Sequence, residues 1–201
     1  LDIIRKNRQD EAKVDDCLDK INLSASHLLA LVNDVLDMNK LESGKETIES
    51  ASFDLKHLMD DVASLVNARI TEMGITHCTH RGELTHTRLI GSPLRLRQIM
   101  LNLFSNAIKY NKPGGMIDTY AGEVSCDGTR VVYEFRITDS GIGMSSEFIE
   151  KELFHPFTQE KSGARTQYKG TGLGMSIVKE LIEKMQGTIE VTSQQGVGTT
   201  Y

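Results

Sequence analysis

Residues 96–110 read Leu-Arg-Gln-Ile-Met-Leu-Asn-Leu-Phe-Ser-Asn-Ala-Ile-Lys-Tyr, a stretch that predicts a helix with one apolar and one polar face. Its inner face carries apolar residues at four-residue steps: Ile99, Leu103 and Ala107. Asn102 and Asn106 share the polar face, with Lys109 one turn beyond. An amide oxygen suits a partly hydrated Mg²⁺ ion, and a lysine supplies a point charge for phosphate. The helix alone is weak evidence, because helix asparagines are more often solvated or capping.

A second polar motif, Asp139-Ser140-Gly141-Ile142-Gly143, directly follows a predicted strand. The Asp139 carboxylate can accept a hydrogen bond from the exocyclic amine of a nucleotide base. Gly141 and Gly143 let the backbone approach a ligand closely. Taken by itself, the motif would indicate an ordinary turn.

A glycine-rich segment opens the last predicted helix, and it consists of Lys169, Gly170, Thr171, Gly172, Leu173 and Gly174. Glycines at a helix start expose amide N–H groups and the positive end of the helix dipole to phosphate. The segment is not a P-loop, since no Gly-Lys-Ser/Thr follows. It is not a dinucleotide-binding fingerprint either, because it follows a loop late in the chain. In order, the three motifs account for the metal, base and phosphate contacts of a nucleotide pocket.

Helices and strands alternate irregularly around these motifs. Helices are predicted from Asp54 to Met73, from Pro93 to Tyr110 and from Gly172 to Gln186. Strands are predicted at residues 45–51, 75–80, 88–90, 116–122, 130–138, 188–193 and 196–201, with an Asp127-Gly128 hairpin turn. Residues 140–170 are predicted to form a long loop with a short helix inside, and we expect this loop to be a lid. Without regular βαβ alternation, the expected fold class is α+β, a two-layer sandwich.

A long amphipathic helix is predicted before this domain, since residues 10–41 contain neither Gly nor Pro. Apolar residues recur every 3.5 positions along it: Val14, Leu18, Ile21, Ala25, Leu28, Val32 and Val35. That spacing is typical of a coiled-coil seam, which favours one half of a helical hairpin that dimerises. The alternative is a long helix packed on its own domain. We therefore expect two units, residues 1–44 and residues 45–201, with residues 1–6 as the tail of a truncated first helix.

Composition excludes several classes of protein. The 201 residues carry a net charge of -5, which disfavours nucleic-acid binding. No apolar run is long enough to span a membrane, so we expect a cytosolic domain without membrane contact. The three cysteines, at positions 17, 78 and 126, lack the spacing of a zinc or redox motif, and the six histidines show no metal-ligand spacing.

Together these motifs resemble the sensor histidine kinases of two-component signalling. Residues 96–110 are similar to their asparagine box, 139–143 and 170–174 to their two glycine boxes, 154–157 (Phe-His-Pro-Phe) to their phenylalanine box, and 196–200 to their final Gly-Thr-rich turn. Residues 33–44 are similar to the second helix of their dimerisation and phosphotransfer domain. The resemblance implies a Bergerat-type ATP-binding domain from about residue 45 onward.

The resemblance also implies a set of ligand contacts. Mg²⁺ would be bound by Asn106, phosphate by Lys109 and adenine by Asp139, with Tyr110 beside the base or ribose. The residues expected to contact ATP are Asn102, Asn106, Lys109, Tyr110, Asp139, Gly141, Gly143, Phe157, Lys169, Gly170, Thr171, Gly172, Leu173 and Gly174.

The implied activity is transfer of the ATP γ-phosphate to a histidine and then to an aspartate of a response-regulator receiver domain. The implied dimer forms through residues 10–42. In the family the phosphoacceptor is a histidine followed by an acidic residue, and none of the six histidines fits, including His27 on the long helix. We therefore assign no catalytic residue and expect the chain to bind ATP without phosphorylating itself. The parent protein's membrane anchorage stays open.

Two other functions compete with this interpretation. ATPases of the gyrase, mismatch-repair and heat-shock chaperone type carry a water-activating Glu four residues before the metal-binding Asn. Here that position is Asn102, which has no basic form to accept a proton and therefore favours phosphoryl transfer over hydrolysis. The second alternative is a non-catalytic dimerisation module with a degenerate pocket, although no pocket motif is visibly degenerate.

Overall fold

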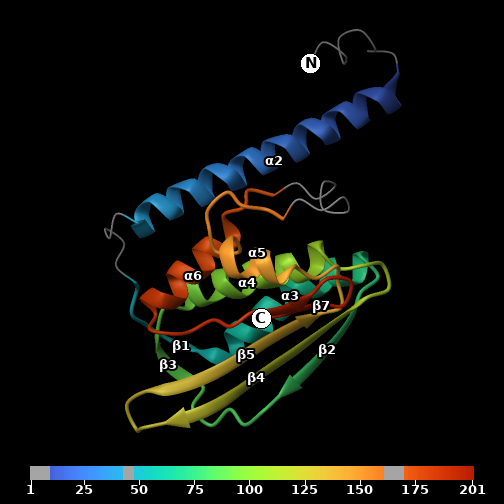
Figure 1. Cartoon of the computed structure of the whole chain (residues 1–201). Coiled ribbons are helices and arrows are strands. Elements are labelled where there is room, and N and C mark those ends of the chain that lie inside the picture. Colours follow the sequence, from blue (N-terminus) through green and yellow to red (C-terminus); the bar gives the residue numbers. More distant parts are fainter. Residues whose placement is uncertain (1–9, 43–47, 161–169) are drawn as a thin grey trace.

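A five-stranded sheet carries three helices on one face in the computed structural model, which describes residues 10–42, 48–160 and 170–201 (Figure 1). The strand order is β2 (Thr76–Arg81), β4 (Met116–Cys126), β5 (Val131–Asp139), β7 (Gly198–Thr200) and β6 (Thr192–Gln194). Strands β2 and β4 are parallel, and the other neighbours are antiparallel. This arrangement confirms the α+β two-layer sandwich.

The three covering helices are α3 (Leu55–Glu72), α4 (Pro93–Lys109) and α6 (Gly174–Lys184). Asp54 caps α3 by accepting a hydrogen bond from the His57 backbone N–H at 3.1 Å, as predicted. The apolar faces predicted from periodicity pack together on the sheet, and the side chains of Ile177, Val178 and Leu181 are fully buried. The core therefore lies between the helices and the sheet, directly beneath the polar face of α4.

The first predicted strand is misplaced. Residues 48–50 have no regular structure, and β1 comprises Ala51–Asp54, where the sequence predicted the start of a helix. Strand β1 pairs antiparallel with β3 (Arg88–Gly91) in a separate two-stranded sheet. Pairing with a strand more than thirty residues away decided this placement, and local propensity could not reveal it. Residues 45–47 lie outside the described residues.

The β4–β5 hairpin has its turn at Asp127-Gly128, as predicted. The Asp127 carboxylate accepts hydrogen bonds from the backbone N–H groups of Thr129 at 2.8 Å and Arg130 at 2.7 Å. These hydrogen bonds lower the pKa of Asp127 to about 2, and the one from Arg130 contributes most. The turn is therefore held by an ionised side chain at neutral pH.

The C-terminal part is more irregular than predicted. Helix α5 (Ser146–Lys151) lies within the long loop as expected, but α6 begins at Gly174 and ends at Lys184, two residues inside each predicted end. The predicted strand 188–193 shrinks to Thr192–Gln194, where β6 pairs with β7. The predicted strand 196–201 is β7, limited to residues 198–200, and Tyr201 still exchanges backbone hydrogen bonds with Ile137.

Helix α2 (Glu11–Glu42) confirms the predicted long helix, and its C-terminal part lies on α6 (Figure 1). Leu41 is buried in the core, and Asp37 accepts a hydrogen bond from the Gln98 side chain on α4 at 3.0 Å. Upstream, members of the 3.5-residue repeat such as Leu28 and Val32 are exposed. One end of the helix therefore packs on its own domain, as the second alternative expected, and dimerisation through the exposed apolar stripe stays a prediction. The predicted helix tail at residues 1–6 and the stop at residues 43–44 lie outside the described residues.

No helix in the described parts of the chain is long and apolar enough to cross a membrane.

Candidate functional site

A cavity of about 270 Å³ opens between α4, the start of α6 and the segment that follows β5. Nine of the residues predicted to contact a nucleotide line it: Asn102, Asn106, Lys109, Tyr110, Asp139, Gly170, Thr171, Gly172 and Gly174. They come from three stretches separated by about thirty residues each, so the fold brings the three predicted motifs to one place.

The α4 wall of the cavity is polar because the helix period places Asn102, Asn106 and Lys109 on one side. The Lys109 ammonium donates a hydrogen bond to the Tyr110 hydroxyl at 2.9 Å and lies 4.5 Å from the centre of its ring. This wall offers two amide oxygens and one cation to a ligand.

The Asp139 carboxylate sits where β5 ends between two neighbouring strands, opposite Ile117 of β4 and Thr199 of β7. The residue is 5% exposed, and its Oδ1 atom accepts a hydrogen bond from the Gly141 backbone N–H at 2.9 Å. A Cβ atom at Gly141 would collide with the backbone carbonyl of Tyr110 and crowd this carboxylate. Gly141 therefore lets the chain turn tightly behind Asp139.

The glycine-rich segment is anchored on both sides. The Thr171 hydroxyl accepts a hydrogen bond from the Leu173 N–H at 3.2 Å and donates one to the Asp34 carboxylate of α2 at 2.9 Å. Gly172 has a positive φ of 73° and its carbonyl accepts a hydrogen bond from the Phe157 N–H at 3.0 Å. The segment thus joins the cavity to α2 and to the predicted lid.

The lining of the cavity lacks five of the predicted contact residues. Four of them are described and lie elsewhere, and the fifth is outside the described residues. Gly141 and Gly143 shape the loop behind Asp139, and the Leu173 side chain is fully buried in the core. The Phe157 side chain is largely exposed, on a backbone with a positive φ of 63°. Lys169 lies outside the described residues.

Sequence reasoning missed the apolar wall of the cavity. Met144, Phe148 and Leu153 line it, and Met144 and Leu153 are buried. Each lies in the weakly periodic stretch after β5, where the only signal was an apolar residue within a polar loop. It also missed Asp34, which reaches the cavity rim from α2.

The cavity is lined by charged residues of both signs. Arg69 and Lys109 supply positive charge, whereas Asp34, Asp139 and Glu160 supply carboxylates. Burial raises the pKa of Asp34, and Asp37 nearby adds to the increase, while the Thr171 hydrogen bond opposes it. With a buried carboxylate, an apolar wall and a cation with amide oxygens, the cavity can hold a flat amine-bearing ring and an anionic tail.

Residues 91–201 match the family model described as histidine kinase-, DNA gyrase B-, and HSP90-like ATPase. The chain is 36% identical over 200 residues to hybrid signal transduction histidine kinase B of Dictyostelium discoideum, covering 100% of this chain and 10% of that protein. It is 38% identical over 186 residues to signal transduction histidine-protein kinase BarA of Escherichia coli K12, covering 92% of this chain and 20% of that protein. The chain therefore spans a fifth or less of these two relatives.

Two solved structures share its architecture. Full-length ShkA in complex with AMPPNP matches with a TM-score of 0.74 and 30% identity, over 94% of this chain and 37% of that chain. The histidine kinase ThkA in complex with the response regulator TrrA matches with a TM-score of 0.66 over 90% of this chain and 48% of that chain. At 23% identity, the second likeness concerns the fold alone.

Proposed function

Because the chain belongs to the histidine kinase-, DNA gyrase B- and HSP90-like ATPase family, as the ATP-binding catalytic part of a two-component sensor histidine kinase, we propose that its cavity binds ATP with Mg²⁺ and donates the γ-phosphate to a histidine. The single observation that carries the assignment of the cavity is that the buried Asp139 lines it. An ionised carboxylate can only accept hydrogen bonds, and the exocyclic amine of adenine can donate one.

The apolar wall supports the placement of the base. Met144 and Leu153 are buried residues that line the same cavity as Asp139, and they would offer an apolar surface for the flat face of a purine. Tyr110 also lines the cavity, where it would border the base or ribose. Asp139 would hold the amine of the base, and the apolar residues would contact its ring.

The polar wall of α4 fits the triphosphate and its metal ion. An amide oxygen of Asn106 is a neutral hard ligand, and Mg²⁺ accepts few protein ligands while it keeps waters and phosphates. Bound Mg²⁺ would neutralise charge on the phosphates. Asn106 would hold the ion, Asn102 would border it, and Lys109 would pair with phosphate oxygens.

Phosphoryl transfer fits this site better than hydrolysis. Asn102 occupies the position one helical turn before Asn106 and lines the cavity, yet its amide cannot take a proton from water. Positioning and electrostatics carry most of the catalysis in phosphoryl transfer, and this wall supplies both without a general base.

Asp139→Asn tests the proposal. The amide keeps the shape but loses the charge and places an N–H₂ group against the adenine amine, so ADP binding should weaken by about 2–3 kcal/mol, roughly 30- to 150-fold. Calorimetry with ADP and Mg²⁺ measures the change. The control is Asp60→Asn on α3, which removes an exposed carboxylate paired with Arg81 and should leave the affinity unchanged. Equal affinity of both variants would refute the placement of the base.

In the full-length protein we assign residues 1–44 to a dimerisation and phosphotransfer hairpin and residues 45–201 to the ATP-binding domain. A homodimer through residues 10–42 would cover exposed apolar residues of α2, such as Leu28 and Val32. The downstream acceptor would be the aspartate of a response-regulator receiver domain.

A further inference from the structure

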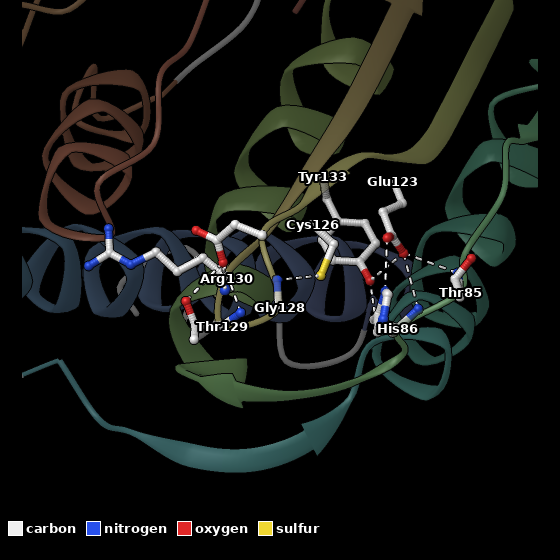
Figure 2. Close-up of polar contacts among 9 residues, drawn as sticks. Thr85, His86, Glu123, Cys126, Gly128, Thr129, Arg130 and Tyr133 are labelled. Atoms are coloured by element: carbon white, nitrogen blue, oxygen red, sulfur yellow. Dashed lines mark hydrogen bonds and ion pairs between the residues drawn. The ribbon is translucent and has the colours of Figure 1, made fainter.

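Three metal-ligating side chains meet at the β4–β5 hairpin, outside the nucleotide cavity. His86 lies in the connection from β2 to β3, and Glu123 and Cys126 lie near the end of β4. One ligand atom from each falls within 4.8 Å of the other two. Figure 2 shows Glu123, His86 and Tyr133 joined by hydrogen bonds, with Cys126 beside them.

A β-bulge brings two of these ligands to the same side of the strand. Glu123 and Cys126 are three positions apart, so in a regular strand their side chains would point to opposite faces. The pairing of β4 with β5 shifts register between Glu123 and Ser125, and the extra residue restores a common face. This irregularity explains why sequence spacing gave no metal signal.

Glu123 is held in place before any ion binds. Its side chain is 11% exposed, its Oε2 atom accepts the backbone N–H groups of Thr85 at 3.1 Å and His86 at 3.0 Å, and its Oε1 atom lies 2.9 Å from Nδ1 of His86. These bonds, led by those from His86, hold the pKa of Glu123 below its usual range. The Tyr133 hydroxyl donates to the His86 carbonyl and lies 3.5 Å from Glu123 Oε2. Such supporting contacts are typical of the surroundings of metal ligands.

The other two ligands have room to adjust. The His86 side chain is 49% exposed and Cys126 is also exposed, with its sulfur contacted by the Gly128 N–H at 3.4 Å. A tetrahedral ion sets its ligand atoms about 3.3–3.8 Å apart, given ligand bonds of about 2.0–2.3 Å. Because the ligand atoms already lie within 4.8 Å of one another, we expect rotation of these two exposed side chains to bring them to that spacing.

We propose that His86, Glu123 and Cys126 form a binding site for a Zn²⁺-class ion, with its fourth position open to water. One imidazole, one carboxylate and one thiolate form a donor set that suits Zn²⁺, whereas Mg²⁺ and Ca²⁺ prefer oxygen ligands. A bound ion would fix the 82–87 connection to the hairpin. None of the three residues lines the nucleotide cavity, so the site is separate from ATP binding.

Titration of the chelator-treated chain with Zn²⁺ and with Co²⁺ tests the proposal. Calorimetry should show one Zn²⁺ ion per chain, undisturbed by excess Mg²⁺, and Co²⁺ should give the charge-transfer absorption of a thiolate ligand. Cys126→Ser should abolish that absorption and weaken Zn²⁺ binding roughly tenfold or more, and His86→Gln should weaken it similarly. Circular dichroism verifies that each variant is folded.

The matched control is Cys78→Ser, which removes a half-buried cysteine of β2 and should change neither signal. Zn²⁺ affinity of Cys126→Ser equal to that of the unmodified chain would overturn the proposal. It would also be overturned by equal losses in Cys78→Ser and Cys126→Ser, or by the absence of saturable Zn²⁺ binding.

Discussion

His77 on strand β2 is a titratable residue whose side chain contacts two helices. The half-buried ring has Nδ1 2.9 Å from Asn67 Oδ1 and Nε2 3.1 Å from Thr119 Oγ1, and its edge meets the Phe104 ring with centroids 5.9 Å apart. Burial lowers the pKa of His77, although the Asp118 carboxylate opposes the decrease. The neutral ring therefore fits the fold better than the charged one.

This residue makes stability depend on pH. Between the lowered pKa of the folded state and the value of about 6.5 in the unfolded state, the unfolded chain binds more protons. The free energy of unfolding should therefore rise with pH through this window and fall on acidification below about pH 6.5. Urea unfolding of the chain and of His77→Gln across about pH 5–7.5 measures the difference, and the variant should show a smaller slope.

His57→Gln on α3 is the control, because it removes an exposed histidine. A slope that His77→Gln leaves unchanged would contradict the prediction.

Some helices and strands of this fold could be predicted from the local sequence, whereas others depend on partners that are distant in the sequence. Periodicity predicted α3, α4 and α6, and the Asp127-Gly128 turn predicted the hairpin, because each is stabilised mainly by neighbours in sequence. Strand β1 was misplaced and β6 was predicted too long, because both depend on partners elsewhere in the chain. Of the candidate site, the three motifs were predictable, whereas the Met144–Leu153 wall was not, because its apolar residues follow no period.

Shortening a buried side chain on the inner face of helix α6 should destabilise the fold. Ile177 is 0% exposed between the helices and the sheet, so Ile177→Ala should lower the free energy of unfolding by about 2–5 kcal/mol through lost burial and a cavity. Leu65→Ala on α3 is the matched control, since that side chain is 57% exposed and should change stability by less than about 1 kcal/mol. Urea unfolding compares them, and similar small losses in both would argue against the described packing.

Helix α2 is hydrogen-bonded to two of the segments that carry the candidate nucleotide site. Its Asp34 carboxylate accepts the Thr171 hydrogen bond at the cavity rim, and Asp37 accepts one from Gln98 on α4, the helix that carries the asparagines. The proposed dimerisation helix thus contacts two of the three motifs that were predicted to bind a nucleotide. Because Asp34 is hydrogen-bonded to Thr171, a movement of α2 would displace the glycine-rich segment.

The chain by itself should accept no phosphoryl group. None of its six histidines is followed by an acidic residue, so we expect no radiolabel after incubation with γ-labelled ATP and Mg²⁺. Calorimetric binding of ADP by the same preparation shows that the site is intact. Acid-labile radiolabel on His27 or on another histidine would contradict this expectation.

Periodicity, turn residues and short spacings were enough to predict the helices, the hairpin and the residue types of the pocket motifs. The folded structure was needed to show which residues wall the cavity and how α2 packs on α6. It also decided that His86 meets Glu123 and Cys126 across a bulged strand. The reason is physical: those features depend on contacts between residues distant in sequence, whose spacing carries no local signal.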